Sequence, residues 1–181
     1  MPLLPIVKLP DPILREVSTP IEAIDAGVRN LARDMLATMY DAPGVGLAAI
    51  QVGVPRRLLV VDVGERDDTE ADGEARDEKR KPSPITMINP TIVRESDGRR
   101  VYEEGCLSLP DVQVEIERPN EITVAFVDLE GRSVELTADG LLATAIQHEI
   151  DHLNGRLIID YLSRLRRDIV VRKFKKLARG G

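Results

Sequence analysis

The sequence is poor in the residues that build disulfide frameworks and aromatic cores. Its 181 residues include one cysteine, two histidines, two phenylalanines, three tyrosines and no tryptophan. A single cysteine excludes an intramolecular disulfide, which favours a reducing compartment. No apolar run approaches the roughly 18 residues of a membrane-spanning helix, and the opening residues, Met1 to Pro5, lack the segments of a secretory signal. We therefore expect a soluble, cytoplasmic protein with no membrane partner.

The composition is otherwise that of an ordinary globular protein. Hydrophobic residues make up 43% of the chain and charged residues 31%, with a net charge of −6. The length suits a single domain over residues 1–181. Residues 65–84 are almost entirely charged residues, glycine and proline, so we expect a solvated loop inserted in the domain rather than a domain boundary.

Helices are predicted where apolar residues recur at steps of three and four. These regions are residues 21–40, residues 141–153 and a basic tail over residues 163–178. The tail from residue 164 to 179 has eight lysines and arginines and one acid. If it is a solvated amphipathic helix, it would pack through Leu165, Ile169, Val170 and Phe174. The alternative is that it docks on ribosomal RNA.

Extended segments fill the rest of the chain. Residues 3–18 should be extended with a short turn after Asp11, and residues 44–51 read as an apolar loop bounded by glycine. Turn residues separate the remaining β-rich runs, as in an antiparallel meander. Strands are therefore expected at residues 57–63, 85–93, 101–102, 112–116, 122–128 and 133–136. The order of helix, many strands and helix predicts an α+β fold.

The strongest chemical signal is the segment from Gln147 to His152, which contains both histidines of the chain. Two imidazoles four residues apart lie about 40° apart around a helix and one turn along it, so both can bind one cation. Glu149 follows the first histidine and could act on water at that cation without being a ligand. This arrangement is typical of zinc-type hydrolases, although a surface pair of histidines would give the same spacing.

A catalytic metal of this kind needs a third protein ligand. The longer metalloprotease pattern has histidine at position 158, which is Ile158 here, and no glutamate follows Glu149. Asp160 and Asp168 are formal candidates, and the simplest donor is the one thiol, Cys106. A cysteine and two histidines leave the fourth position open, and a thiolate also admits iron, cobalt or nickel. A nucleophilic cysteine or an ordinary buried thiol are the alternatives.

Three segments resemble the signature motifs of the peptide deformylase family. They are GVGLAAIQ at residues 44–51, EGCLS at 104–108 and QHEIDH at 147–152, in the family's order. The resemblance implies antiparallel sheets packed around a central helix that carries the H-E-x-x-H motif, with an N-terminal and a C-terminal helix. It also implies a bacterial-type enzyme that removes the formyl group from the formyl-methionine of new polypeptides. The chief departure, the insert at residues 65–84, lies outside the motifs.

The resemblance also implies roles for individual residues. Cys106, His148 and His152 would bind the metal, and Glu149 would be the general acid and base. The Gln51 amide and the Leu107 backbone N–H would bind the oxygen of the tetrahedral intermediate. Ferrous iron (Fe2+) is the expected physiological metal, and Zn2+, Ni2+ or Co2+ could take the same ligands.

The substrate would be a nascent N-formylmethionyl peptide, with no role for DNA. The expected contacts are an extended loop for the peptide backbone and an apolar pocket for the methionine, from Val45, Gly46, Gly105, Leu141 and Ala145. Leu141 and Ala145 lie seven and three residues before His148 and share its helix face.

Two further expectations concern the surroundings of the metal ligands. Glu104 should pair with Arg118 and so fix the loop of the cysteine. Asp151 could orient a ligand or merely face solvent, and the second interpretation is slightly favoured. Two other functions remain open from the residues: a peptidase of the H-E-x-x-H kind, and a metal-binding or RNA-binding domain without catalysis.

Overall fold

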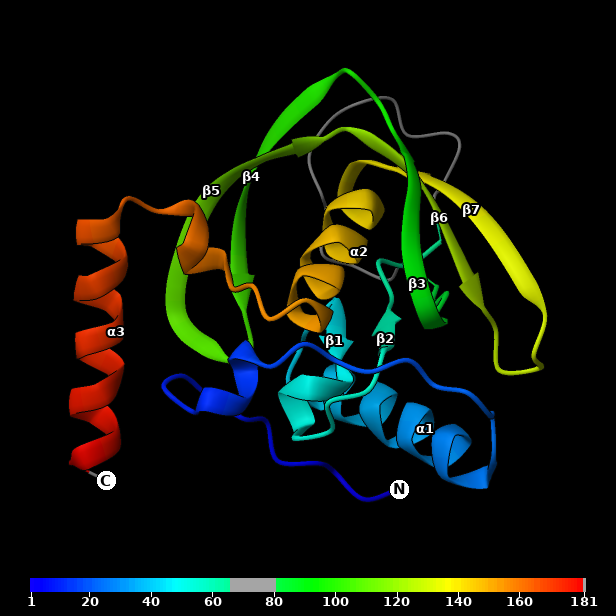
Figure 1. Cartoon of the computed structure of the whole chain (residues 1–181), viewed down its shortest axis with the longest axis horizontal. Coiled ribbons are helices and arrows are strands. Elements are labelled where there is room, and N and C mark those ends of the chain that lie inside the picture. The colour runs from blue at the N-terminus through cyan, green and yellow to red at the C-terminus, as the bar shows by residue number, and fades with distance from the viewer. Residues whose placement is uncertain (66–80, 181) are drawn as a thin grey trace.

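The structure, a computed structural model, describes residues 1–65 and 81–180. Its seven strands within this part of the chain are β1 (Gly46–Ala48), β2 (Leu58–Val61), β3 (Ile85–Glu95), β4 (Arg99–Cys106), β5 (Leu109–Pro119), β6 (Glu121–Val127) and β7 (Ser133–Asp139). Its helices are α1 (Ala26–Asp41), α2 (Gly140–Leu153) and α3 (Arg164–Arg179), with 3-10 helices η1 (Pro12–Arg15), η2 (Ala49–Val52) and η3 (Ile158–Tyr161). Figure 1 shows α2 in the middle of the molecule, between the two sheets. The expected α+β class is confirmed.

The strands do not form one meander, as the turn pattern had suggested. One antiparallel sheet has the order β1-β2-β3-β6-β7, and β4 and β5 form a separate two-stranded sheet. Val114 and Ile116 of β5 are buried in a cluster with Leu14, Leu157 and residues of η3, apart from the core of the larger sheet. Burial against these N-terminal and C-terminal segments gives β4 and β5 a packing surface of their own.

The core lies on both faces of β2, whose four residues are all fully buried. Leu59 and Val61 pack in the cluster that includes the apolar side of α2. Leu58 and Val60 pack in the cluster that includes the apolar side of α1. A strand covered on both faces needs apolar side chains at every position, which explains the uninterrupted run Leu-Leu-Val-Val.

Helix α1 begins at Ala26, five residues later than the periodicity predicted. The Asp25 carboxylate accepts a hydrogen bond from the Val28 N–H at 2.9 Å and caps the helix. Upstream, the Asn89 side chain bonds both the N–H and the carbonyl of Ile21, at 2.8 Å each. This pairing keeps Ile21 out of the helix although the residue is buried in the same core.

The expected apolar loop at residues 44–51 is ordered as β1 followed by η2. The segment also pairs with β2 in antiparallel register, with Gly46 opposite Val61. The prediction of a loop was wrong because three residues are too few for a sequence period to appear. The expected turn after Asp11 is η1, in which the Asp11 carboxylate accepts from the Ile13 N–H at 3.0 Å.

Helix α2 begins and ends close to the predicted residues, with Asp139 and Asn154 flanking it. The chain then turns at Gly155, which has a φ of +74°. A Cβ at this position would lie 2.5 Å from the backbone oxygen of Arg15, so a side chain is excluded there. The glycine therefore lets the end of α2 pack directly on the N-terminal segment.

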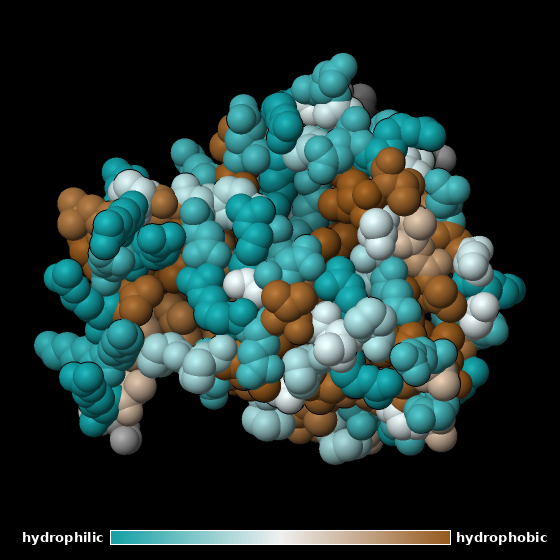
Figure 2. Space-filling model, viewed as in Figure 1, coloured by the Kyte–Doolittle hydropathy of each residue, from teal (hydrophilic) through white to brown (hydrophobic). Residues whose placement is uncertain are grey.

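Helix α3 contacts the body through two of the four residues that were expected to pack, Val170 and Phe174, and not through the other two. Phe174 is buried, and Val170 and Val171 pack in the same cluster. Leu165 and Ile169 are 70% and 56% exposed, so the prediction that they pack on the body was wrong. Leu165 precedes Phe174 by nine residues, about two and a half helical turns, and therefore lies on the opposite side. Figures 1 and 2 show α3 at one end of the molecule, densely covered with hydrophilic side chains.

The predicted insert at residues 65–84 falls mostly outside the described residues, but its two ends are visible. The Glu65 N–H donates to the Lys81 carbonyl at 2.8 Å. One oxygen of the Asp62 carboxylate accepts from the N–H groups of Gly64 and Ser83, at 2.8 and 3.0 Å. Its other oxygen accepts from the Tyr40 hydroxyl. The ends of the insert are therefore tied together beside α1.

None of the helices within residues 1–65 and 81–180 is both long and apolar enough to cross a bilayer.

Candidate active site

The two histidines of α2 meet the cysteine at the end of β4. The Cys106 sulfur lies 3.3 Å from Nε2 of His152, which lies 3.2 Å from Nε2 of His148. One ligand atom from each residue falls within 4.8 Å of the other two. The helical spacing of the histidines thus has the geometric effect that the sequence predicted, and Cys106 is the third member of the group.

A thiolate and two imidazoles form a donor set that fits a divalent transition metal. All three side chains are at least partly buried, and both Nε2 atoms face the sulfur. Asp160, a formal alternative, instead accepts from Arg15 at 2.6 Å and from the Leu157 N–H at 3.0 Å. The donor atoms of Cys106, His148 and His152 are therefore close enough together to hold one metal ion.

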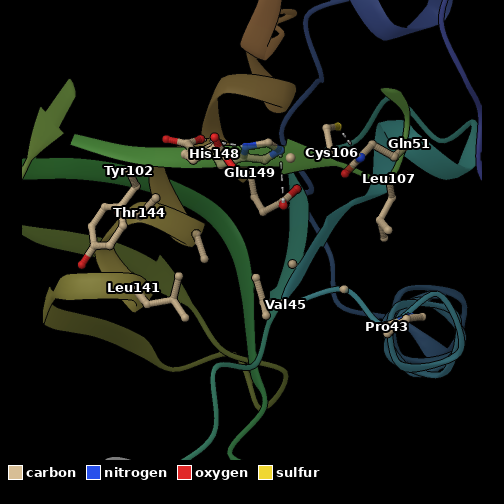
Figure 3. Close-up of a pocket in the computed structure, with 16 residues that line it drawn as sticks. Pro43, Val45, Gln51, Tyr102, Cys106, Leu107, Leu141, Thr144, His148 and Glu149 are labelled. Atoms are coloured by element: carbon tan, nitrogen blue, oxygen red, sulfur yellow. Dashed lines mark hydrogen bonds and ion pairs between the residues drawn. The ribbon is translucent and has the colours of Figure 1, made fainter. Parts of the chain in front are cut away.

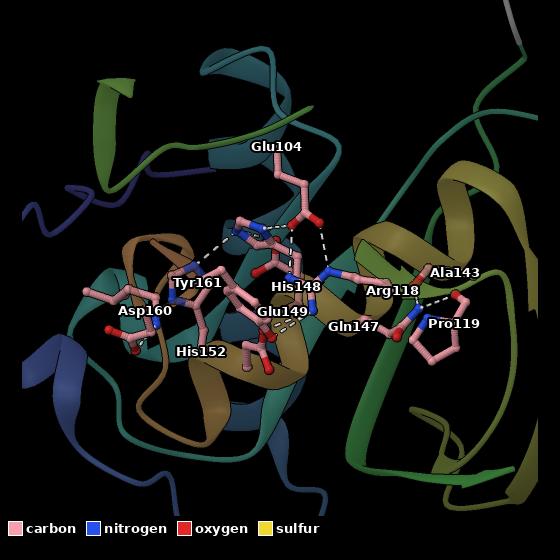
Figure 4. A network of polar contacts seen from close by, with 12 residues as sticks. Glu104, Arg118, Pro119, Ala143, Gln147, His148, Glu149, His152, Asp160 and Tyr161 are labelled. Atoms are coloured by element: carbon pink, nitrogen blue, oxygen red, sulfur yellow. Dashed lines mark hydrogen bonds and ion pairs between the residues drawn. The ribbon is translucent and has the colours of Figure 1, made fainter. Parts of the chain in front are cut away.

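Glu104, two residues before the cysteine on β4, holds the outer nitrogen of one histidine. Its Oε1 accepts from Nδ1 of His148 at 3.0 Å, which leaves Nε2 of that ring facing the cysteine. Arg118 of β5 donates two hydrogen bonds to the same carboxylate, from Nε at 2.7 Å and from Nη2 at 3.0 Å. The expected Glu104–Arg118 pair is thus confirmed, and Figure 4 shows Glu104 above His148, with Arg118 to one side. A fixed outer partner sets the tautomer and direction of a metal-binding imidazole.

Asp151 belongs to the same network, so the interpretation that it merely faces solvent was wrong. Its Oδ2 accepts from Nη1 of Arg118 at 3.0 Å and from the Tyr161 hydroxyl at 2.7 Å. The side chain sits on α2, one turn along from Gln147 and pointing toward η3. It neutralises the part of the guanidinium that Glu104 does not reach.

The electrostatics of the metal-free group follow from burial and these bonds. Burial lowers the pKa of His148, but hydrogen bonds with Cys106 and Glu104 outweigh it and hold that pKa well above its usual value. Burial lowers the pKa of His152 well below its usual value, and the neighbouring His148 adds to this effect. In the metal-free group, His148 is therefore favoured in its charged form and His152 in its neutral form.

Glu149 lies next to this group and is buried, with few interactions that would offset the cost of burying its charge. Its Oε1 is 4.0 Å from Nε2 of His148, and its Oε2 has no hydrogen-bond partner within the described residues. Burial raises the pKa of Glu149 to about 7, in spite of the opposing attraction of His148. A carboxyl with a pKa near neutrality can both take and return a proton at working pH.

Gly46 of β1 lies directly against the Glu149 carboxyl. A Cβ at Gly46 would lie 2.6 Å from Oε1 of Glu149, so the strand can approach the carboxylate this closely only without a side chain. The contact with Glu149 is a reason for glycine at this position that the sequence did not suggest, and the expected contact of Gly46 with a peptide backbone stays a prediction.

Gln51 reaches the cysteine from η2. Its Oε1 accepts from the Ala48 N–H at 2.9 Å, which orients the amide. Its Nε2 donates to Ser108 Oγ at 3.1 Å and lies 3.6 Å from the Cys106 sulfur. Leu107 lies in the turn between β4 and β5, next to the cysteine in sequence. Both residues therefore border the space in front of the metal group.

A cavity of about 360 Å³ opens in front of Glu149 and His148. Figure 3 shows Tyr102, Thr144 and Leu141 on one side of Glu149, and Cys106, Gln51 and Leu107 on the other. Of the residues proposed for substrate binding, all five line this cavity: Val45, Gly46, Gly105, Leu141 and Ala145. Val45 and Leu141 are 44% and 42% exposed, which leaves apolar surface at the mouth of the cavity.

Tyr102 and Thr144 line the cavity and were missed from the sequence. Thr144 lies four residues before His148, a spacing that could have selected it together with Ala145. Tyr102 alternates with Glu104 and Cys106 on β4 and so shares their face of the strand. Tyr102 and Cys106 can be placed on one face only if β4 runs from residue 99 to 106. The sequence had predicted a strand of two residues, 101–102, so this relation was not found.

Comparison with known proteins gives one consistent answer. The model of the family described as polypeptide deformylase matches residues 3–168. A peptide deformylase of Rhizobium meliloti strain 1021 is 58% identical over 179 residues, covering 99% of this chain and 96% of the relative. One from Mesorhizobium japonicum is 55% identical, covering 99% and 95%.

Solved structures agree with the sequence relatives. A crystal structure of peptide deformylase from Ehrlichia chaffeensis has a TM-score of 0.85 and 40% identity, covering 98% of this chain and 97% of that one. The same enzyme in complex with actinonin has a TM-score of 0.86, also at 40% identity, covering 97% and 98%. With the family model matched over most of its length and close relatives covering nearly all of it, this chain belongs to the peptide deformylase family of metal-dependent hydrolases.

Proposed function

We propose that this enzyme hydrolyses the N-formyl group from the amino-terminal formyl-methionine of nascent polypeptides, using a metal held by Cys106, His148 and His152. The observation that carries the proposal is the convergence of these three ligand atoms within 4.8 Å beside the buried carboxyl of Glu149. We propose Fe2+ as the physiological metal, with Zn2+, Ni2+ or Co2+ able to take the same thiolate and imidazole ligands.

The chain's own residues would divide the reaction between them. A divalent cation bound here supplies a water of lowered pKa, near 7, and polarises a carbonyl oxygen. Glu149 takes a proton from the water as the water oxygen bonds to the formyl carbon. It returns a proton to the departing nitrogen as the carbon–nitrogen bond breaks, so that formate and a free amino terminus leave.

The oxygen of the formyl group becomes negatively charged as the water adds. Gln51 Nε2 and the Leu107 N–H would donate hydrogen bonds to it. The Gln51 amide is already oriented by the bond from the Ala48 N–H, and such preorganised donors favour the charged intermediate over the neutral substrate.

The peptide backbone would lie between two strand edges. Within the described sheets, β1 pairs with β2 alone and β4 with β5 alone, and residues of both β1 and β4 line the cavity. An extended chain can therefore add as a strand between them. Val45, Leu141 and Ala145 would contact the methionine side chain, with Gly46 and Gly105 leaving room for the backbone.

The proposed function is tested with anaerobically purified protein and two peptides, formyl-Met-Ala-Ser and Met-Ala-Ser. We expect formate release from the first, no cleavage of the second, and about one metal ion per chain by elemental analysis. Cleavage of the peptide bonds would instead indicate a peptidase. A bound metal without turnover of either peptide would indicate a binding protein and would contradict the proposal.

We also propose that α3 contacts the ribosome, which would place the enzyme in the cytoplasm beside its substrate. Eight lysines and arginines against one acid give the helix a strongly positive charge, which attracts RNA phosphates. Leu165 and Ile169, which face away from the body, leave the outer side of the helix free for such a contact.

Removing residues 165–181 is expected to abolish co-sedimentation with ribosomes at low salt while leaving turnover of formyl-Met-Ala-Ser within about twofold. Binding of the full chain should weaken steeply as salt is raised, because counterions compete for the phosphates. Unchanged co-sedimentation of the shortened chain would exclude α3 as the contact.

A further inference from the structure

Tyr161 joins the C-terminal part of the chain to the network behind the metal ligands. It is the last residue of η3 and lies two residues before Ser163, which caps α3. Its hydroxyl donates to Oδ2 of Asp151 at 2.7 Å and accepts from Nη1 of Arg118 at 3.1 Å. Its ring stacks 5.0 Å from the guanidinium of Arg118 and 5.0 Å from that of Arg156. Figure 4 shows Tyr161 close to Arg118 and His148.

Arg118 connects Tyr161 to the residues around the metal site. The Arg118 side chain is only 6% exposed, and its fork binds Glu104 at one end and Asp151 with Tyr161 at the other. A planar guanidinium cannot turn at one end without moving the other. The orientation of Glu104 therefore depends on what holds the far end of Arg118.

Glu104 in turn holds His148, through the 3.0 Å contact with Nδ1. An unbroken series of hydrogen bonds thus leads from the Tyr161 hydroxyl through Arg118 and Glu104 to the imidazole. The contacts on Nη1 of Arg118 also form a closed triangle, because Asp151 and Tyr161 bind each other as well as the nitrogen. Such a triangle fixes a direction better than either contact would alone.

We propose that Tyr161 is a positioning residue for the metal-binding imidazole of His148, acting through Arg118 and Glu104. The inference rests on the proposed metal function of Cys106, His148 and His152. Without the hydroxyl, Nη1 of Arg118 keeps Asp151 alone, and the Asp151 side chain is 16% exposed and free to turn toward solvent. Arg118 then loses one of its two anchors at that end, and Glu104 holds the ring less rigidly.

The test compares Tyr161→Phe with Tyr40→Phe. Tyr40 also donates its hydroxyl to a carboxylate, that of Asp62, but it belongs to α1 and not to the Arg118 network. Both substitutions remove one phenol–carboxylate hydrogen bond, and Tyr161→Phe also removes the bond that the hydroxyl accepts from Nη1 of Arg118. Arg156→Leu is the second control, since it removes a stacking partner of the Tyr161 ring and keeps the hydroxyl.

Three readouts are taken on the full chain loaded with Co2+ or Fe2+: the visible absorption of the cobalt form, the rate of metal loss to a chelator, and kcat and KM. We expect Tyr161→Phe to lose metal about tenfold faster, the low end for an outer partner of a ligand. We also expect a shifted cobalt spectrum, and a lower kcat with KM unchanged. Tyr40→Phe and Arg156→Leu should keep the metal-loss rate and spectrum of the parent.

A Tyr161→Phe protein with the parent's metal-loss rate and cobalt spectrum would overturn the inference. So would equal changes in Tyr40→Phe, which would indicate a general loosening of the fold. Melting temperatures of the metal-free variants separate the two cases, because the controls should be destabilised without any change at the metal. If the parent chain itself binds no metal or releases no formate, it is the proposed function that fails.

Discussion

Replacing Glu149 with glutamine is expected to lower kcat for formyl-Met-Ala-Ser by about 10²- to 10⁴-fold, the range for a general acid and base. The amide has the shape of the carboxyl but cannot take a proton from water or return one to the amine. Because Cys106, His148 and His152 are unchanged, the variant should bind metal in the same amount as the parent. Steady-state turnover and elemental analysis of the same samples provide the measurement.

The metal-free form of this variant gives an independent check. The folded pKa of Glu149, about 7, lies above the value near 4.3 of an unfolded chain. The ionised carboxylate is therefore unfavourable in the fold, and its cost is full above about pH 7 and absent below about pH 4. Metal-free Glu149→Gln should melt at a higher temperature than the parent at pH 8, with the difference disappearing toward pH 4. A variant that keeps parental turnover would refute the catalytic role.

Replacing Gln51 with glutamate is expected to lower kcat by about 10²- to 10³-fold, as the loss of one oxyanion donor does elsewhere. A glutamate oxygen can still accept from the Ala48 N–H, as Gln51 Oε1 does at 2.9 Å. The other oxygen replaces the Nε2 donor and repels both the developing oxyanion and the thiolate of Cys106. The substitution thus changes the charge facing the substrate and preserves the anchoring bond.

Ser108→Ala is the matched control for Gln51→Glu. It removes the hydroxyl that accepts from Gln51 Nε2 at 3.1 Å but leaves the amide itself as a donor. We expect its kcat to remain within about threefold of the parent. If Ser108→Ala falls as far as Gln51→Glu, the hydrogen-bonded pair matters rather than the donor to the oxyanion. Metal content must be equal in all three proteins for the comparison to hold.

Much of the candidate site could be predicted because its chemistry depends on scarce residues. The i, i+4 spacing of His148 and His152 fixes a shared face on any helix, and only one thiol was available to complete the set. Glu104 and Arg118 could be paired because β4 and β5 follow one another in an antiparallel hairpin, although in the register Glu104 stands opposite Val114 and Arg118 opposite Arg100. The spacing on a helix and the order of two consecutive strands were enough for these predictions.

The residues that sequence reasoning missed depend on contacts between distant segments. Asp151 and Tyr161 both bind Arg118, from which they are 33 and 43 residues away in sequence. No periodicity in the sequence predicts contacts of this kind. The face of α3 that packs on the body depends on the hydrophobic cluster around Phe174. Leu165 and Phe174 are both apolar, so the helical period alone does not choose between them. Ile21 follows the helical period of α1 and yet is held extended by Asn89, 68 residues away.

The bonds at Asp62 have a consequence for protein engineering. Gly64 and Ser83 are held by the same carboxylate oxygen, so the chain leaves and rejoins the fold at almost one point. A segment grafted between residues 65 and 81 therefore needs two ends that lie close together. Many small folded domains have termini that meet this condition. Because the Asp62 N–H also donates to the Val45 carbonyl at 2.9 Å, a fluorescent or affinity module grafted here would stand beside the mouth of the cavity and could report on peptides entering it.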